Sequence, residues 1–569
     1  MPNAAGMKSL CRTTLFLVLL CCGVVLWPIS IYDPNDRIYT LLSEWEEKGY
    51  IDFLPMLRPY SPQLVTECLE KVIQRGGDID RETARAYLSH IRAEGAVLAF
   101  SPSDASAVSI GFDTVFDGFA STASGGFGRP SLALSVSGRL AGSFIQFSGM
   151  TGLWLFDRKE ADFIPHRSAV SVYFPHGGDA VLTLGATTYD VASLWKGGIF
   201  LGNATAYFQA GLMRSAFGPF FETSSVLGPQ APEAGCFAFT YRTGWITMSS
   251  VLLELAATQA VGSGTLMSGG ATTVPYGEIY QLKGTTSFFP SKYMALHSAF
   301  VTPFPWLGFG LMQTSVFGAR LDPLLLVPFG ILADSQFWQG DWDNAFMGLF
   351  ARIRPCSNLV ANASLYVDDL NSNEALKLNF DSGQDKLALH AGVAWILPVP
   401  ATVRLSAEYL MITPYTYSHF RDLFLNYLNY VNFDQHLGSI LDPNSDQLIV
   451  RAQLQLNPMI SGMLWLRLSR HGNGSDHGEG SVAGDGSIWD DGVAPDGTET
   501  YYGSSTFLTQ KVLEKILQVG LRVETELRFV PVKASVLAEY TLEVVQNTGL
   551  ERGKDTTTHY VKLSVRAGL

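Results

Sequence analysis

The C-terminal part of the chain alternates apolar and polar side chains with a period of two, which places them on opposite faces of an extended strand. The same alternation returns in residues 448–456, 521–529 and 534–544. A soluble sandwich also alternates, but its strands are usually shorter and its apolar face meets a second sheet. In the last strand, Val561, Leu563 and Val565 form the apolar face. The opposite, polar face consists of Lys562, Ser564 and Arg566.

Strands of about ten residues with one apolar and one charged face are typical of a closed barrel in lipid around a polar interior. Similar alternation, in residues 132–136, 182–184 and 403–409, extends this reading from about Ser106 to Leu569. About 460 residues at about ten per strand predict on the order of 16 to 20 strands, in even number. The predicted fold class is therefore all-β, a many-stranded antiparallel transmembrane barrel that occupies residues 96–569.

The connections between strands are expected to differ at the two ends of the barrel, with short turns on the periplasmic side and long loops outside. Residues 457–458 and 529–533 fit short turns, whereas the segments assigned to the outside are much longer. These long segments are residues 214–236, 413–446 and 471–503.

Residues 31–95 differ in kind and predict a small bundle of three amphipathic helices. Asp33 can cap the first helix with Pro34 at its first position, and Ser61 followed by Pro62 repeats this signal. The third helix is expected to begin near Asp80 and to end at Gly95. The bundle precedes the first strand, so it should begin on the periplasmic side, either free or as a plug in the barrel mouth.

Residues 1–30 are expected to be a signal peptide, because basic residues precede an apolar run that is short for a membrane span. Cleavage is placed between Gly23 and Ser30, and lipid attachment at Cys21 or Cys22 is the alternative. No later stretch approaches the roughly 20 apolar residues of a spanning helix. The predicted location is the cell outer membrane, with the chain inserted as a monomer by the barrel assembly machinery and surrounded by outer-membrane lipid.

Composition changes this picture little, but it excludes some functions. Of 569 residues, 47% are hydrophobic and only 16% are charged, and the formal net charge of −13 leaves no basic stripe for nucleic acid. Beyond the signal, Cys68, Cys236 and Cys356 stand far apart, which predicts neither a disulfide framework nor a metal site. We expect them to be small buried residues.

Two segments combine aromatic, amide and acidic side chains in the manner of sugar-binding sites, where rings stack on pyranose faces and polar groups bond hydroxyls. The alternative is an interfacial aromatic girdle with ordinary loop turns, which uses the same residue types. The acidic loop at residues 471–503 lacks the spacing of a calcium loop and is expected to be a solvated surface loop. The candidate ligand-binding residues are Trp338, Trp342, Asp343, Asn344, Asp368, Asp369, Tyr415, Tyr417, His419 and His436.

No catalytic arrangement stands out, since histidines are scattered and no Gly-x-Ser-x-Gly occurs. We therefore expect no enzyme activity, no cofactor and no metal. Two functions remain from the residues alone. One is a surface protein that binds polysaccharide, and the other is a porin-like channel for small solutes.

Several short motifs, in the same order, resemble the Wzi-type capsule assembly outer-membrane proteins. The resemblance starts in the helical segment, at residues 36–42, 48–51 and 54–60, and continues in the predicted barrel. There it is carried by Gly340-Asp341-Trp342-Asp343-Asn344, by Leu365-Tyr366-Val367-Asp368-Asp369-Leu370, by Tyr415-Thr416-Tyr417-Ser418-His419 and by His436-Leu437-Gly438 with Asp442-Pro443-Asn444.

This resemblance implies a many-stranded barrel whose lumen is blocked by the helical bundle, and a surface role in anchoring exported polysaccharide without catalysis. The segments 220–236 and 471–503 depart from the family's pattern. Because loops determine which glycan is bound, the resemblance bears on fold and compartment more than on the ligand.

Overall fold

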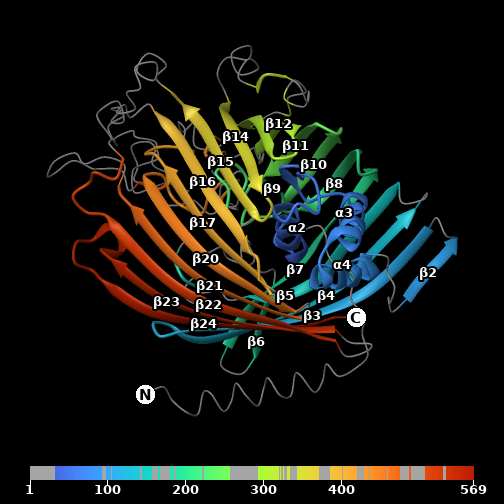
Figure 1. Ribbon diagram of the computed structural model, residues 1–569. Coiled ribbons are helices and arrows are strands. Elements are labelled where there is room, and N and C mark those ends of the chain that lie inside the picture. The colour runs from blue at the N-terminus through green and yellow to red at the C-terminus, as the bar shows by residue number, and fades with distance from the viewer. Residues whose placement is uncertain are drawn as a thin grey trace, which may run out of the picture.

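Alternating strands close into an antiparallel β-barrel in a computed structural model of the chain (Figure 1). No helix in the part of the chain that the structure describes is long and apolar enough to cross a membrane. The described residues are 33–91, 98–103, 106–140, 144–156, 164–166, 180–184, 187–220, 223–256, 292–318, 321, 325, 330–332, 343–370, 385–399, 401–418, 428–432, 435–457, 459–473, 486–488, 507–528 and 533–568. The predicted signal peptide lies outside them.

The barrel has 18 strands, within the range that the alternation predicted. Each strand pairs with the next along the chain, and the last closes on the first through Gly568 opposite Asp113 and Tyr560 opposite Ser121. The barrel strands are β3 (Ser106–Ser121), β4 (Gly125–Leu140), β5 (Ile145–Phe156), β7 (Thr187–Gly202), β8 (Ala206–Met213), β10 (Ala234–Arg242), β11 (Ile246–Leu255), β12 (Lys292–Phe304), β13 (Leu307–Gly318), β14 (Asn344–Cys356), β15 (Leu359–Asp369), β16 (Lys386–Leu397), β17 (Thr402–Ile412), β20 (Ser445–Asn457), β21 (Ile460–His471), β22 (Glu514–Arg528), β23 (Lys533–Gln546) and β24 (Thr556–Gly568).

Among the described residues, six short strands lie outside this cycle. β2 (Leu98–Ser103) pairs with the beginning of β3, and β6 (Ala180–Leu184) pairs with β7. The predicted strand around residues 182–184 is thus an addition to the wall. The other four form two small pairs, β1 (Leu57–Arg58) with β9 (Ala216–Phe217) and β18 (Val431–Asn432) with β19 (Gln435–His436).

The two faces of the strands point as the alternation predicted. Val561 and Leu563 in β24 are 49% and 39% exposed on the outside, whereas Lys562 and Arg566 line the interior. Comparable outward apolar side chains occur on strands all around the cycle, from Leu134 in β4 to Leu521 in β22. An apolar outer surface on a closed barrel without free edges is the arrangement that lipid requires, and the protein is an outer-membrane barrel.

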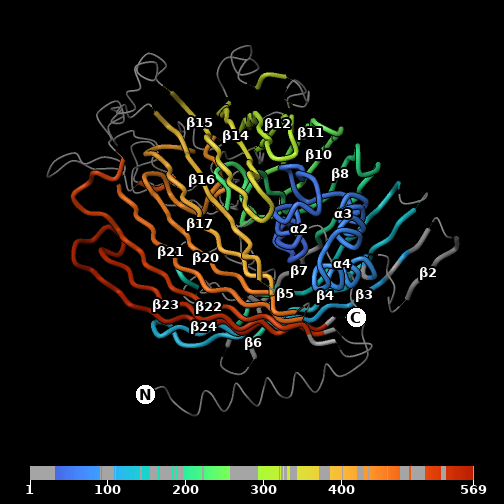
Figure 2. Tube along the Cα trace, in the orientation of Figure 1, coloured from blue at the N-terminus to red at the C-terminus, as the bar shows by residue number. Residues whose placement is uncertain are grey.

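Helices α2 (Arg37–Glu47), α3 (Pro62–Arg75) and α4 (Asp78–Ile91) form the expected bundle, which lies within the ring of strands (Figure 2). Ser61 caps α3 as predicted, by accepting a hydrogen bond from Leu64 N. The predicted cap of the first helix was wrong by one turn. Asp36 caps α2, and Asp33 instead accepts from Asn35 in the preceding turn, because the chain bends there before the helix begins.

The bundle lies at the end of the barrel that carries the short turns. Asn358, in the turn between β14 and β15, donates its N–H to the carbonyl of Glu47, and Gln63 bonds Gly202 at the end of β7. Short turns are typical of the periplasmic side, so this is the periplasmic end. The bundle is therefore a plug in the mouth of the barrel, one of the two arrangements that the sequence left open.

Candidate functional site

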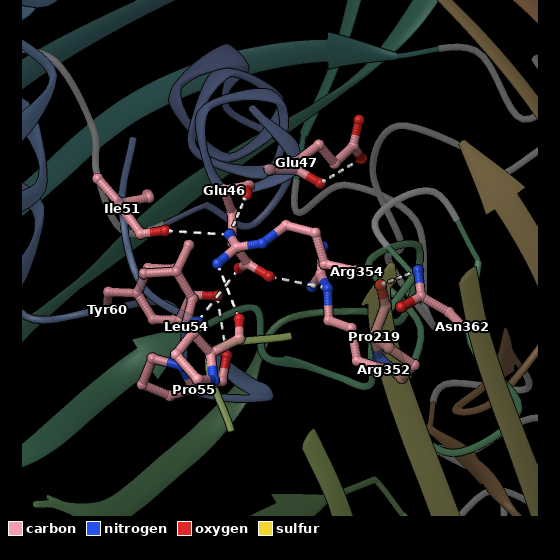
Figure 3. A network of polar contacts seen from close by, with 12 residues as sticks. Glu46, Glu47, Ile51, Leu54, Pro55, Tyr60, Pro219, Arg352, Arg354 and Asn362 are labelled. Atoms are coloured by element: carbon pink, nitrogen blue, oxygen red, sulfur yellow. Dashed lines mark hydrogen bonds and ion pairs between the residues drawn. The ribbon is translucent and has the colours of Figure 1, made fainter. Parts of the chain in front are cut away.

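Acidic side chains of α2 hold the bundle to the barrel wall through buried ion pairs. Oε1 of Glu46 lies 2.8 Å from Nε of Arg352 in β14, and both side chains are almost completely buried. Arg354, also in β14, donates to the carbonyls of Glu46 and Ile51 at 2.6 and 3.4 Å (Figure 3). Removing one partner of such a pair leaves an uncompensated buried charge, so these contacts resist displacement of the helix.

Two other charged residues of α2 also form ion pairs with residues of the barrel wall. Arg404 in β17 forms a two-pronged pair with the carboxylate of Glu47, with both distances 2.8 Å. At the other end of α2, Arg37 bonds Glu526 in β22 at 3.1 Å. Only β20 and β21 separate these two strands, so α2 lies along one sector of the wall. Gln63 of α3 bonds the end of β7, nine places from β17 in the ring of 18 strands, so the bundle as a whole spans the lumen.

Burial within the barrel changes the acidity of one carboxyl group in α2 and of the carboxyl group that caps this helix. Burial raises the pKa of Glu44 to about 7, against the opposing effect of Arg404 and Lys48. Burial also raises the pKa of Asp36 to about 6, although the N–H of Ile38 favours its charged form. Both residues line an internal cavity, so this wall of the cavity loses negative charge as the pH falls toward 6.

A second layer of protein fills the lumen nearer the other end, and it comes from the long connections. In the connection after β8, the strand β9 pairs with β1 of the helical segment, Phe217 opposite Leu57. In the connection after β17, the carbonyl of Leu437 accepts from Gly228 N at 2.7 Å. The predicted outer loops at 214–236 and 413–446 therefore fold inward in part, because their apolar residues join the same buried core as Leu57.

Four aromatic rings form the centre of this inner layer. Tyr417 and Tyr430 stack with ring centroids 5.4 Å apart, and Phe346 and Tyr366 of the wall stack at 5.1 Å beside them. Tyr417 adopts a φ of 74°, a left-handed conformation that is costly for a tyrosine. Its N–H bonds Asp368 at 2.8 Å and its hydroxyl bonds the carbonyl of Ser225, so these contacts hold the strained turn.

The structure brings together part of the predicted glycan-binding set. Asp368 and Tyr417 meet at the aromatic cluster, where Asp368 accepts from the N–H of Tyr417, and Asn344 donates to the carbonyl of Leu428 at 3.1 Å. Asp343 and Tyr415 are also buried. In this conformation Asn344 and Asp368 hydrogen-bond residues of the inner layer, and direct contact between any of the five residues and a glycan stays a prediction.

The remaining predicted residues lie elsewhere. Asp369 is exposed at the end of β15 and accepts from the N–H of Leu370. His436 in β19 places Nε2 3.3 Å from Oδ1 of Asp442. Trp338, Trp342 and His419 lie outside the described residues. Among the described residues, no three His, Cys, Asp or Glu side chains are grouped in a way that could hold a metal ion.

An internal cavity of about 880 Å³ remains between α2 and the half of the barrel formed by β20–β24 and β3–β8. Its lining contains eight basic and eight acidic side chains. Trp465 of β21 and Phe119 of β3 contribute aromatic rings, and Gln447, Gln453 and Gln518 contribute amides. The cavity thus combines ring faces with hydrogen-bond donors and acceptors inside the barrel.

The residues that build both the plug contacts and this cavity carry no signal in the sequence that identifies their roles. Arg352 and Arg354 alternate with apolar neighbours in β14, which signals a lumen-facing charge but not its partner. Glu46 lies on an amphipathic helix, where a charged residue would ordinarily face water. One expectation about cysteines was wrong, because Cys356 is exposed at a turn, whereas Cys68 and Cys236 are buried.

The fold and the occupied lumen define the class: an 18-stranded outer-membrane barrel with an internal helical bundle. A solved structure of similar fold is Wzi of Escherichia coli, described as an outer-membrane protein involved in group 1 capsule assembly and as a carbohydrate-binding β-barrel. It is 12% identical to this chain with a TM-score of 0.54, and the match covers 96% of this chain and 99% of Wzi.

Two Pseudomonas aeruginosa outer-membrane structures match less well. OprD is 9% identical with a TM-score of 0.42, and the match covers 81% of this chain and 93% of OprD. OpdK, solved with vanillate, is 10% identical with a TM-score of 0.42 over 81% of this chain and 98% of its own. No protein-family model and no curated protein sequence matches the chain.

Proposed function

We propose that the chain is a Wzi-type, non-enzymatic outer-membrane protein that binds exported surface polysaccharide and retains it at the cell surface. The observation that carries this proposal is the anchored plug. The bundle spans the lumen, because Glu47 of α2 pairs with Arg404 in β17 and Gln63 of α3 donates to the carbonyl of Gly202 at the end of β7, on the opposite side of the ring. A barrel obstructed in this way is better suited to binding than to free passage of solutes. The carbohydrate binding described for Wzi, a barrel of similar fold, points in the same direction.

The proposal includes the surroundings of the barrel. Its outer face meets outer-membrane lipid, the barrel assembly machinery inserts it, and one copy of the chain acts as a monomer. Direct glycan contacts are assigned first to Trp338, Trp342 and His419, which lie outside the described part, while other predicted ligand-binding residues, such as Tyr417, are buried in this conformation.

Retention of polysaccharide provides the test of function. Cells that export polysaccharide but lack the chain should release it into the medium, and restoring the chain should return it to the cell surface. A variant in which Trp338, Trp342 and His419 are replaced by alanine should insert normally and retain less polysaccharide. Equal retention with and without the chain would contradict the proposal.

The position of the contacts can be tested separately by cysteine labelling on intact cells. Trp342→Cys should react with an impermeant reagent if that residue faces outward. Tyr417→Cys should not react, because Tyr417 is 1% exposed inside the barrel. A cysteine placed between Ser475 and Asp496 serves as the positive control. If this control reacts while Trp342→Cys does not, Trp342 loses its assignment.

A channel for small solutes is the second candidate, and the cavity of about 880 Å³ is the observation that favours it. Planar-bilayer recordings separate the two candidates. We expect negligible single-channel conductance from the intact protein and a large increase when residues 33–95 are deleted. Robust conductance from the intact protein would favour the channel.

A further inference from the structure

The wall of the internal cavity carries an aromatic ring laid flat over a glycine. Trp465 in β21 pairs with Gly520 in β22, and its indole lies over that glycine. A Cβ at position 520 would stand 1.9 Å from Cζ2 of the ring, so the ring takes this position only because residue 520 has no side chain. One face of the indole is thus covered by backbone, while the residue also lines the cavity.

Hydrogen-bonding groups flank this ring along β22. On the side toward the bundle, the guanidinium of Arg522 lies 5.9 Å from the ring centroid and donates to Glu539 of β23 at 2.7 Å. On the other side, Arg467 donates to the amide oxygen of Gln518 at 2.8 Å. Each cation is therefore already joined to an acid or an amide. Both sides of the ring therefore offer hydrogen-bond donors together with acceptors, and neither side is an unpaired positive charge.

Two polar atoms that line the cavity have no hydrogen-bond partner among the described residues. They are Oδ1 of Asp113 in β3 and Oγ of Ser135 in β4, and both side chains are at least nine-tenths buried. Buried polar atoms usually have a partner, and a ligand or water in the cavity can supply it. These atoms provide an independent sign that the cavity is built to hold a polar occupant.

We propose that this cavity binds an uncharged, hydroxyl-rich saccharide segment, with Trp465 as the stacking platform for a pyranose ring. This inference rests on the proposed function and places a binding site of that function inside the barrel. The volume of about 880 Å³ lies within the range of about 300–1,000 Å³ that small-molecule sites occupy, which suits a short oligosaccharide. The equal numbers of acidic and basic lining groups favour a neutral sugar over an anionic one, because neither sign of charge prevails.

Binding of defined trisaccharides to the full-length barrel in detergent tests this assignment by titration calorimetry. We expect neutral maltotriose or cellotriose to bind. Trp465→Ala should weaken binding at least tenfold, and Trp465→Phe should weaken it less because a ring remains. The matched control is Trp395→Ala, since Trp395 is 47% exposed on the outer face of β16 and should leave the affinity unchanged. Heat-modifiable gel migration of each variant establishes that the barrel has folded.

Three outcomes would overturn the inference. These are equal binding by Trp465→Ala and the unsubstituted protein, binding of trigalacturonate in preference to both neutral sugars, and binding of none of the three. The polysaccharide-retention assay keeps the two proposals distinguishable. If the Trp465→Ala protein binds neutral trisaccharide as before and cells that carry it still retain polysaccharide, the internal site is refuted but the proposed function is not. If polysaccharide retention does not depend on the chain at all, the proposed function is refuted.

Discussion

Single charged residues, buried by the barrel, determine how the helical plug is held. Glu46 and Arg352 lie in contact with almost no exposure to water, and Glu46 also accepts a hydrogen bond from the N–H of Leu54. An exposed pair in the same bundle, Lys71 with Asp52, has a similar distance of 2.8 Å. The two pairs differ in burial, and burial should decide what each contributes.

We expect Arg352→Ala to lower the stability of the protein by about 3–5 kcal/mol, because the Glu46 carboxylate would be left buried without its partner. The matched control, Lys71→Ala, should cost at most about 1 kcal/mol because its pair is exposed. The midpoint of thermal unfolding in detergent measures both. Replacing both buried partners, as in Glu46→Leu with Arg352→Met, should restore much of the loss. A loss from Arg352→Ala no larger than that from Lys71→Ala would contradict this account.

Glu44 provides a prediction that depends on pH. Its pKa is raised from 4.5 to about 7 in the folded protein, so the folded state binds more protons than the unfolded state between these values. The contribution of Glu44 to the free energy of unfolding is therefore complete below about pH 4.5, and it is lost as the pH rises toward 7. Glu44→Gln should stabilise the protein by up to about 3 kcal/mol at pH 8 and have little effect at pH 4.

Thermal midpoints of the unsubstituted and Glu44→Gln proteins at pH 4 and pH 8 measure this difference. Glu67→Gln, at an exposed position of α3, is the control and should change neither midpoint. A stabilisation by Glu44→Gln that is equal at both pH values would show that ionisation of Glu44 is not its cause.

At the level of the elements, the strands could be predicted well from the sequence and the inner layer could not. The period of two in β20, β22, β23 and β24 follows from a wall with lipid on one side and a polar lumen on the other, so each strand carries its own evidence. The connection at residues 413–444 carries no such local signal. Its fold depends on contacts with distant residues, such as the hydrogen bond from Lys292 Nζ to the carbonyl of Asn429.

The facing of β24 gives a prediction at this level. Leu563→Arg places a charge on the lipid-facing surface and should cost about 2–4 kcal/mol near the middle of the membrane. Ser564→Arg, one residue further on the lumen face, should be tolerated much better. The yield of heat-modifiable barrel and its midpoint of unfolding compare the two variants. Equal tolerance of both changes would argue that this strand does not contact lipid.

At the level of the whole molecule, function depends on how much of the lumen the plug and inner layer leave open. The sequence could predict the bundle from its caps and helical spacing, and it left open whether the bundle stands free. Only the assembled barrel shows Arg352, Arg404 and Glu526, from three separate strands, around one helix. The cavity is equally invisible in the sequence, since Trp465 and Gly520 are separated by 54 intervening residues and meet only through strand pairing.

If these ion pairs hold the plug, breaking two of them should open the barrel without deleting any residue. The double variant Arg352→Ala with Arg404→Ala leaves Glu46 and Glu47 buried without their cations, which favours movement of α2 out of the lumen toward water. We expect openings of measurable single-channel conductance from this variant in planar bilayers, against negligible conductance from the unsubstituted protein. Arg129→Ala, which removes an arginine paired with Asp117 within the wall, is the control and should stay closed because it does not touch the helix. A double variant that is folded and equally closed would mean that the inner layer at residues 214–233 and 413–444 blocks the barrel by itself, and the plug would then serve stability rather than closure.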